Sequence, residues 1–274
     1  ASKDYAGSIA AFRRAYDVAP SKVQPMVTLV RSYLLAGKAG EAMDFLGSVI
    51  QASPENVTAL LLLGELQAAN GDSAEAVQSF ERVIDLQPQN TAGYTNLANL
   101  RMREGHTDAA EQVIGRGLLA VPGNFDLLMA QASIYEVSRR FEEAIAAYEA
   151  LFKTYPGSDV VVNNLASLLS EHRTDQTSLL RAYEMTQRFS RSDAPYFKDT
   201  LGWASYRLGK FDEGLPLLES AVRQMPGQPI FRYHLGMSYA ALNRKELARQ
   251  ELEKARELSQ GDNQQSTEQI RRAL

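Results

Sequence analysis

The strongest constraint in this sequence is a period of 34 residues. Prolines recur at that spacing, at Pro20, Pro54, Pro88, Pro122 and Pro156. Alanine keeps the same period at Ala42, Ala76, Ala110 and Ala144. A third series of mostly small residues runs beside them, at Val30, Gly64, Ala98, Ala132, Ala166, Gly202 and Gly236. Residue types held in register over seven periods indicate a chain of structural repeats.

Each period predicts two helices joined by a tight turn. In residues 57–90, Leu60 and Leu63 follow helical spacing, Gly71 interrupts the pattern, and Ala76 and Phe80 resume it. A glycine suits the left-handed conformation that often ends a helix, and the second helix ends before a proline, which cannot continue it. Equivalent turn residues stand at Gly37, Gly105, Gly209 and Asn243. The predicted N-caps of first helices are Asn56, Asn90, Asn124 and Ser158.

The small residues predict close helix packing. Alanine or glycine on the first helix and alanine on the second let the two backbones approach, while larger residues such as Phe80 and Tyr148 fill the space between neighbouring pairs. A single pair cannot bury its apolar face, so the pairs must stack into a solenoid. We therefore expect Ala76, Ala110 and Ala144 to be buried at helix crossings.

The pattern Leu63-Gly64, Ala76, Phe80 and Pro88 resembles the tetratricopeptide repeat (TPR) family, and it returns near the end of the chain around Leu235-Gly236. The resemblance covers about residues 1 to 260. It implies an all-α fold, a right-handed superhelical solenoid of TPR helix-turn-helix repeats. The predicted repeats are 23–56, 57–90, 91–124, 125–158, 159–194, 195–228 and 229–262.

The two ends and the fifth repeat depart from the period. Residues 1–22 match the second helix of a truncated repeat, so we expect the chain to begin inside a longer array. Residues 263–274 predict a capping helix or a tail. The fifth repeat predicts an extended turn or a longer helix at residues 171–178. Pro216 is expected near the first turn of a second helix, where proline is tolerated.

No set of residues predicts catalysis or a metal site. Catalysis needs convergent titratable groups, and His106, His172 and His234 stand in the third, fifth and seventh repeats. Because non-adjacent repeats are not expected to touch in a solenoid, solvated turn histidines are the better interpretation. No metalloprotease or phosphate-loop motif occurs. We expect no enzyme activity, no metal and no cofactor, unless a catalytic domain lies outside this chain.

Composition limits the partners. The formal net charge is −4, from 29 basic and 33 acidic residues, which argues against a nucleic-acid partner. No apolar run approaches the roughly 18 residues that span a bilayer, so direct membrane insertion is not expected. The chain has no cysteine, which excludes disulfides but leaves the compartment open. The oligomeric state is also open.

Binding of a protein or peptide segment is the favoured function class. The TPR resemblance implies that first-helix side chains line a concave groove, with Asn96 and Asn164 where peptide-binding members hydrogen-bond a ligand backbone. Arg207 is a candidate partner for a carboxylate, and Trp203 either contacts the ligand or packs between helices. The predicted groove residues are Asn96, Asn99, Asn163, Asn164, Asp199, Trp203, Tyr206, Arg207, Tyr233 and His234.

A narrower resemblance concerns residues 159 to 258. The segments 163–170, 199–203 and 233–237 look like bacterial TPR proteins associated with exopolysaccharide biosynthesis and export. This resemblance implies a periplasmic or cell-envelope scaffold. Two functions therefore remain open. The first is a non-catalytic interaction scaffold, with exopolysaccharide assembly as the setting that the resemblance implies. The second is a docking or regulatory array of a larger enzyme. An appended catalytic domain would favour the second.

Overall fold

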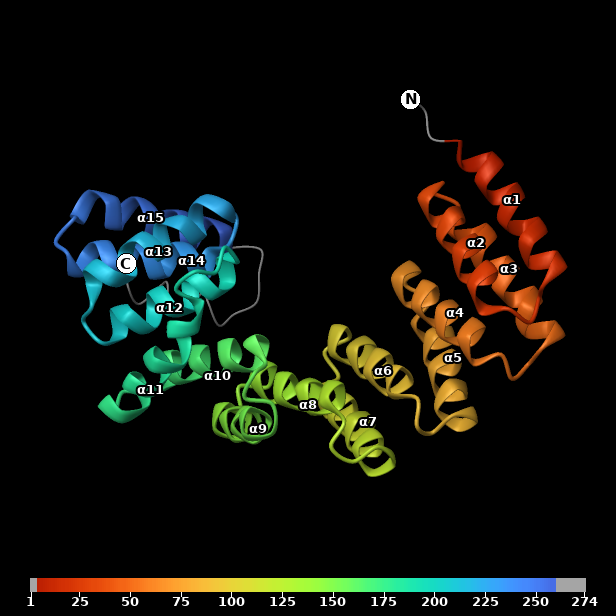
Figure 1. Cartoon of the computed structure of the whole chain (residues 1–274), viewed down its shortest axis with the longest axis horizontal. Coiled ribbons are helices and arrows are strands. Elements are labelled where there is room, and N and C mark those ends of the chain that lie inside the picture. Colours follow the sequence, from red (N-terminus) through yellow and green to blue (C-terminus); the bar gives the residue numbers. More distant parts are fainter. Residues whose placement is uncertain (1–3, 260–274) are drawn as a thin grey trace. The chain divides into compact units, whose positions relative to one another are not determined.

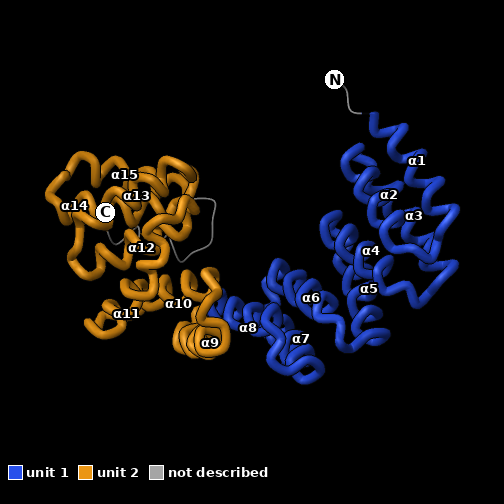
Figure 2. Tube along the Cα trace, viewed as in Figure 1, with its two compact units in different colours: residues 1–138 blue, residues 139–274 orange. Residues whose placement is uncertain are grey.

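The computed structural model describes residues 4–259, which contain fifteen α-helices, one short 3₁₀ helix and no strand (Figure 1). The predicted all-α class is confirmed. The chain divides into two compact units, residues 1–138 and 139–274, and each is described by itself (Figure 2). The predicted terminal segment 263–274 lies outside the described residues.

Unit 1 alternates first and second helices of the repeat. The second helices are α1 (Tyr5–Val18), α3 (Ala39–Ala52), α5 (Ser73–Leu86) and α7 (Thr107–Ala120). The first helices are α2 (Val23–Leu35), α4 (Val57–Asn70), α6 (Thr91–Arg103) and α8 (Phe125–Val137). Ala76 and Ala110 are completely buried, as the small-residue series predicts, and Phe80, Leu97 and Ile114 pack beside them. Small residues therefore set the close crossings, and large ones fill the layers between them.

Unit 2 repeats the same alternation. Its first helices are α10 (Asp159–His172), α12 (Pro195–Arg207) and α14 (Pro229–Ala241). Its second helices are α9 (Phe141–Thr154), α11 (Gln176–Thr186), α13 (Phe211–Gln224) and α15 (Lys245–Ser259), with the 3₁₀ helix Gln187–Phe189 after α11. Ala144 is completely buried here, as predicted.

The predicted turn chemistry is largely confirmed. Gly37, Gly71, Gly105 and Gly209 have positive φ, and Asn243 takes their place with φ 58°. The side chains of Asn56, Asn124 and Ser158 accept the N-terminal hydrogen bonds of α4, α8 and α10. The prediction for Asn90 is wrong, because its side chain makes no cap bond and its amide donates to Gln87 instead.

The fifth repeat is one residue longer around its inter-helix turn, as predicted: α10 begins at Asp159 and α11 at Gln176, 17 residues apart, whereas α12 and α13 begin 16 residues apart. Glu171 lies in the last turn of α10. Pro216 lies inside α13 rather than in its first turn, so the expectation there is wrong and one helical hydrogen bond is lost. Gly214 has a packing reason, because a Cβ at this position would stand 2.6 Å from the carbonyl oxygen of Gly202 on α12.

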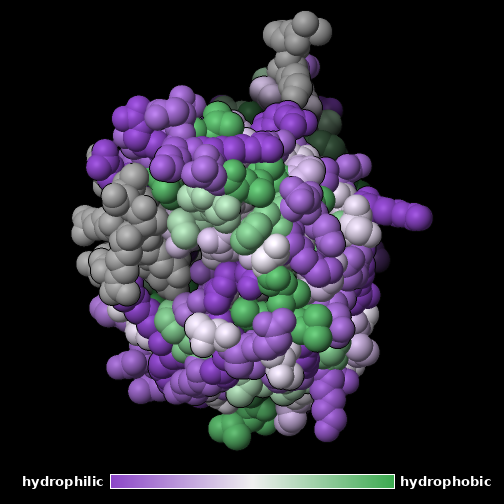
Figure 3. All heavy atoms as spheres, turned by 90° about the vertical axis from the view of Figure 1, so that its left-hand side faces the viewer, coloured by the Kyte–Doolittle hydropathy of each residue, from purple (hydrophilic) through white to green (hydrophobic). Residues whose placement is uncertain are grey.

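The surface is mixed. Hydrophilic residues predominate on the face that Figure 3 shows, and hydrophobic residues form small separate groups between them. Across residues 4–259, no helix combines the length and apolar character needed to cross a membrane.

Candidate functional site

The predicted groove residues all lie on first helices. Asn96 and Asn99 belong to α6 in unit 1, and the other eight belong to α10, α12 and α14 in unit 2. The first-helix faces of the two units are therefore separate candidate sites.

Three titratable side chains converge in unit 2. His234 on α14 places Nδ1 at 2.9 Å from Oδ2 of Asp199 on α12 and Nε2 at 2.9 Å from Oε1 of Glu171 on α10. His234 is only 3% exposed and Asp199 only 5%. We call these three residues the carboxylate–histidine clasp. The expectation that no titratable groups converge is wrong, and so is the interpretation of His234 as a solvated histidine.

The sequence pattern failed here because side chains from non-adjacent repeats can touch. Glu171 belongs to the fifth repeat and His234 to the seventh, and the repeat pattern predicted no contact between these two repeats. Glu171 lies in the last turn of α10, and its carboxylate meets the ring of His234 on α14 although the repeat of α12 stands between them in the chain. Long side chains on alternate first helices therefore meet although the repeats are not consecutive.

The clasp is charged at neutral pH. Burial alone lowers the pKa of His234, but the charges and hydrogen bonds of Asp199 and Glu171 outweigh it and raise the pKa to about 9. Both ring nitrogens then carry protons and donate to the carboxylates. Burial raises the pKa of Asp199, with a further increase from the Glu171 charge and an opposing effect of His234. No group in residues 4–259 is arranged to hold a metal ion.

Trp203 has both ring faces covered. Its indole stacks on Tyr206 at 4.6 Å between centroids and on His234 at 4.1 Å, with interplanar angles of 7° and 13°. Trp203 is 5% exposed, and its Nε1 has no hydrogen-bond partner. A protonated imidazole on the indole face adds a cation–π attraction. Of the two alternatives for Trp203, packing between helices accounts for this position.

The remaining polar side chains of the unit 2 face bind one another. Arg207 donates to the carbonyls of Ser170 and Arg173, so it caps the end of α10. Asn164 donates to the Tyr148 hydroxyl at 3.1 Å. Asn163 accepts from Thr200 at 2.8 Å. Tyr206 and Tyr233 are the predicted aromatic residues that stay partly exposed.

Unit 1 presents a cleft. Between α6 and α8 lies a cavity of about 360 Å³, and its walls include Asn99 and Arg103. Asn99 and Arg103 are exposed and, among residues 4–259, neither has a hydrogen-bond or ion-pair partner. Asn96, one turn earlier, instead donates to Glu65 at 2.9 Å. The other lining residues are Ala98, Met102, Ala130, Ser133, Ile134 and Val137.

Comparison with known proteins identifies the repeat. The model described as "Cytochrome c-type biogenesis protein H TPR domain" matches residues 46–162, and a "Tetratricopeptide repeat" model matches residues 200–264. The chain is a tetratricopeptide-repeat protein. No curated protein sequence matches it significantly.

Solved TPR structures show the same fold. The crystal structure of a tetratricopeptide repeat protein from Parabacteroides merdae is 17% identical, with TM-score 0.65, and the match covers 91% of this chain and 97% of that one. The APC/C hetero-tetramer Cut9-Hcn1 gives 14% identity and TM-score 0.66, covering 98% of this chain and 53% of that one. Yeast Tom70 gives 15% identity and TM-score 0.58, covering 98% and 58%. The TPR chain thus spans little more than half the length of the last two.

The TPR array has contacts that the sequence did not predict. Glu171 was absent from the predicted groove set, although it stands one 34-residue period after Val137 and two after Arg103, and that register was the signal that could have found it. Met102 and Val137 were likewise not predicted as site residues, although they lie near the ends of two neighbouring first helices and line one cleft. The TPR fold itself is that of protein–protein interaction scaffolds.

Proposed function

We propose that this chain is a non-catalytic scaffold that binds an extended partner segment in the cleft between α6 and α8. The observation that carries the proposal is the position of Asn99 and Arg103 at a mostly apolar cleft, because neither side chain has a hydrogen-bond or ion-pair partner among the described residues. The Asn99 amide offers a donor and an acceptor to a peptide backbone. Arg103 offers a planar cation to a carboxylate, and Met102 and Val137 provide apolar contact.

A comparison with the polar side chains of unit 2 supports the choice of the unit 1 cleft. In unit 2 the carboxylates, the amides and Arg207 each bind a neighbouring group of the chain. In unit 1 the side chains of Asn99 and Arg103 have no such partner among the described residues. The occupant that fits is an extended segment with an acidic side chain or a terminal carboxylate next to an apolar residue. The partly exposed Tyr206 and Tyr233 extend the proposal to a second contact on unit 2.

The test is a selection from displayed octapeptides on the whole chain. We expect wild-type protein to enrich peptides that combine a carboxylate with an apolar residue, and Arg103→Glu to lose them. Arg249→Ala is the control, because Arg249 is exposed on α15. Enrichment of the same peptides by wild type and Arg103→Glu would contradict the proposal.

We further propose a periplasmic or cell-envelope location, with exopolysaccharide assembly as the setting. The support is the narrower resemblance of residues 159 to 258 and the match of residues 46–162 to the TPR domain of a cytochrome c-type biogenesis protein. Fractionation of cells that express the tagged full-length protein tests the location, and recovery in the cytoplasm would contradict it.

The alternative is a docking or regulatory array of a larger enzyme. The observation that favours it is that two similar arrays, Cut9-Hcn1 and Tom70, belong to chains of which this array covers 53% and 58%. An activity assay on the full-length protein separates the two functions, because the scaffold proposal expects no turnover.

A further inference from the structure

Two small residues of α8 open the cleft between α6 and α8. Ala130 stands two residues before Ala132, the small residue of the repeat period, and Ser133 directly follows it. The same positions on α4 carry Leu62 and Glu65. Because Ala130 and Ser133 both line the cavity, larger side chains there would occupy its space. The cleft therefore results from side-chain size at two positions of one helix.

The cavity is small and has an apolar floor. Its volume of about 360 Å³ is near the lower end of ligand pockets, which measure roughly 300–1,000 Å³, so it has room for one large side chain of a bound segment. Two of its lining residues, Ala98 and Ile134, belong to the buried core of unit 1, whereas Val137 is 55% exposed. An apolar side chain that enters the cleft thus leaves water for the surface of the core.

Met102 and Arg103 favour an aromatic side chain. Both residues line the cavity, from neighbouring positions of α6. A thioether makes favourable contacts with aromatic rings, and a guanidinium stacks on a ring face. A leucine or isoleucine would fill the same space without either interaction. The lining therefore favours a ring over an aliphatic side chain.

The same arginine can hold an acid beside the ring. The face of a guanidinium stacks while the N–H groups at its edge donate to a carboxylate. Glu104, the next residue in the chain, is held elsewhere, because its carboxylate accepts a hydrogen bond from Arg101 at 3.0 Å. No acidic residue lines the cavity among the residues that the structure describes. Arg103 therefore favours a negatively charged residue of the ligand.

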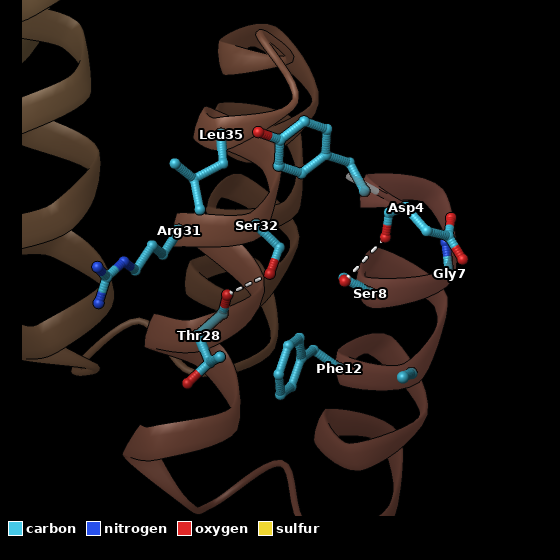
Figure 4. Close-up of a pocket in the computed structure, with 10 residues that line it drawn as sticks. Asp4, Gly7, Ser8, Phe12, Thr28, Arg31, Ser32 and Leu35 are labelled. Carbon is cyan, nitrogen blue, oxygen red and sulfur yellow. Dashed lines mark hydrogen bonds between the residues drawn. The ribbon is translucent and has the colours of Figure 1, made fainter. Parts of the chain in front are cut away.

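The larger cavity between α1 and α2 has no such preference. It measures about 920 Å³, and its walls include both an acid, Asp4, and a base, Arg31 (Figure 4). The hydroxyls of Ser8 and Ser32 donate to backbone carbonyls of their own helices. In the α6–α8 cleft, by comparison, Arg103 is the one charged lining residue within the described part of the chain.

We propose that the ligand of the α6–α8 cleft is an extended segment with an aromatic residue next to an acidic residue, an inference that rests on the proposed function of this cleft. The ring enters the cavity and the acid binds Arg103. Ala130 is the specificity-determining residue, because a larger side chain at this position would fill the space for the ring.

The test compares octapeptides selected on the whole wild-type chain with those selected on Ala130→Leu. We expect wild type to enrich peptides with phenylalanine, tyrosine or tryptophan next to aspartate or glutamate. Ala130→Leu should still enrich the acid, because Asn99 and Arg103 are unchanged, but with glycine, alanine or serine in place of the ring. Ser133→Leu, at an exposed residue of the same wall, should have the same effect.

A binding titration measures the size of the effect. A peptide selected on wild type should bind Ala130→Leu about tenfold or more weakly, whereas the same peptide with alanine in place of its ring should bind both proteins equally. Ala52→Leu, the same change at an exposed position of α3, is the matched control and should bind the ring peptide as wild type does. Circular dichroism checks the fold of each variant, and Ser133→Leu decides the test if Ala130→Leu does not fold.

Failure of this inference and failure of the proposed function give different results. If wild type and Arg103→Glu enrich the same peptides, the proposed function is wrong and this inference is wrong with it. If Arg103→Glu loses the acidic peptides but wild type, Ala130→Leu and Ser133→Leu select the same residue beside the acid, the cleft holds the acid alone and only this inference is wrong. Enrichment of aliphatic residues instead of rings by wild type would also overturn it.

Discussion

The first-helix faces of the two units use the same repeat in different ways. In unit 2, Glu171, Asp199 and His234 bind one another across three first helices, and Trp203 is stacked against the histidine. In unit 1, Asn99 and Arg103 stand over a cleft without partners in the described chain. A polar side chain at a predicted groove position is therefore not always available to a ligand, because neighbouring side chains can already occupy its hydrogen bonds. The following predictions test this difference, beginning with the largest effect.

Trp203→Ala should strongly destabilise unit 2. Removing a buried, doubly stacked indole is expected to cost about 3–5 kcal/mol of unfolding free energy. Urea unfolding followed by circular dichroism measures the effect. Tryptophan fluorescence cannot be used, because Trp203 is the single tryptophan and the variant removes it. Val160→Ala, at a half-exposed valine of α10, should stay within about 0.5 kcal/mol. Similar unfolding of the two variants would show that the stack does not hold the unit together.

Raising the pH should weaken the clasp. The pKa of His234 is about 9 in the folded protein against 6.5 ordinarily, so its contribution is complete below pH 6.5 and is lost as pH rises through 9. The loss is expected to be about 3 kcal/mol. Burial raises the pKa of Asp199 as well. Unfolding midpoints between pH 6 and 10 measure it.

The matched variants for that titration are His234→Gln and His106→Gln. His234→Gln should remove the pH dependence, while His106→Gln, at an exposed histidine, should keep it. A wild-type profile that is flat between pH 7 and 10 would show that His234 is not protonated in the clasp.

Ala110→Leu should disturb unit 1 through packing alone. Ala110 is completely buried where α7 crosses its neighbours, and overpacking there is expected to cost about 1–3 kcal/mol. Ala52→Leu, at the exposed end of α3, makes the same change without a neighbour to crowd. If the two variants have the same thermal unfolding midpoint, small residues do not set the helix crossings in unit 1.

Asn99→Ala should leave stability nearly unchanged and still weaken peptide binding. Surface changes usually stay within about 0.5 kcal/mol of unfolding free energy. A peptide selected on the wild-type chain should bind Asn99→Ala several-fold more weakly, whereas Asn164→Ala, whose amide is engaged with Tyr148, should bind it normally. Weaker binding by Asn164→Ala alone would place the partner on unit 2 and reverse the comparison.

The sequence by itself determined the repeat, the helix pairs and the small-residue crossings. These features depend on local chemistry: Gly71 and Asn243 end helices through positive φ, and Ala76 and Ala110 recur at one phase of a fixed period. Equivalent positions of the repeats carry similar residues, so the helix pair predicted for one repeat applies to the others. The predicted boundaries follow from the same period in six of the seven repeats, and the fifth, 159–194, has 36 residues.

Only the tertiary structure decided which polar groups meet. Glu171 and His234 are 63 residues apart, and their contact depends on how α10, α12 and α14 stack. The same stacking directs Arg207 to the carbonyls of Ser170 and Arg173 rather than to a carboxylate. Periodicity places side chains on a face, but the distances between alternate helices determine whether those side chains bind one another or remain available to a partner.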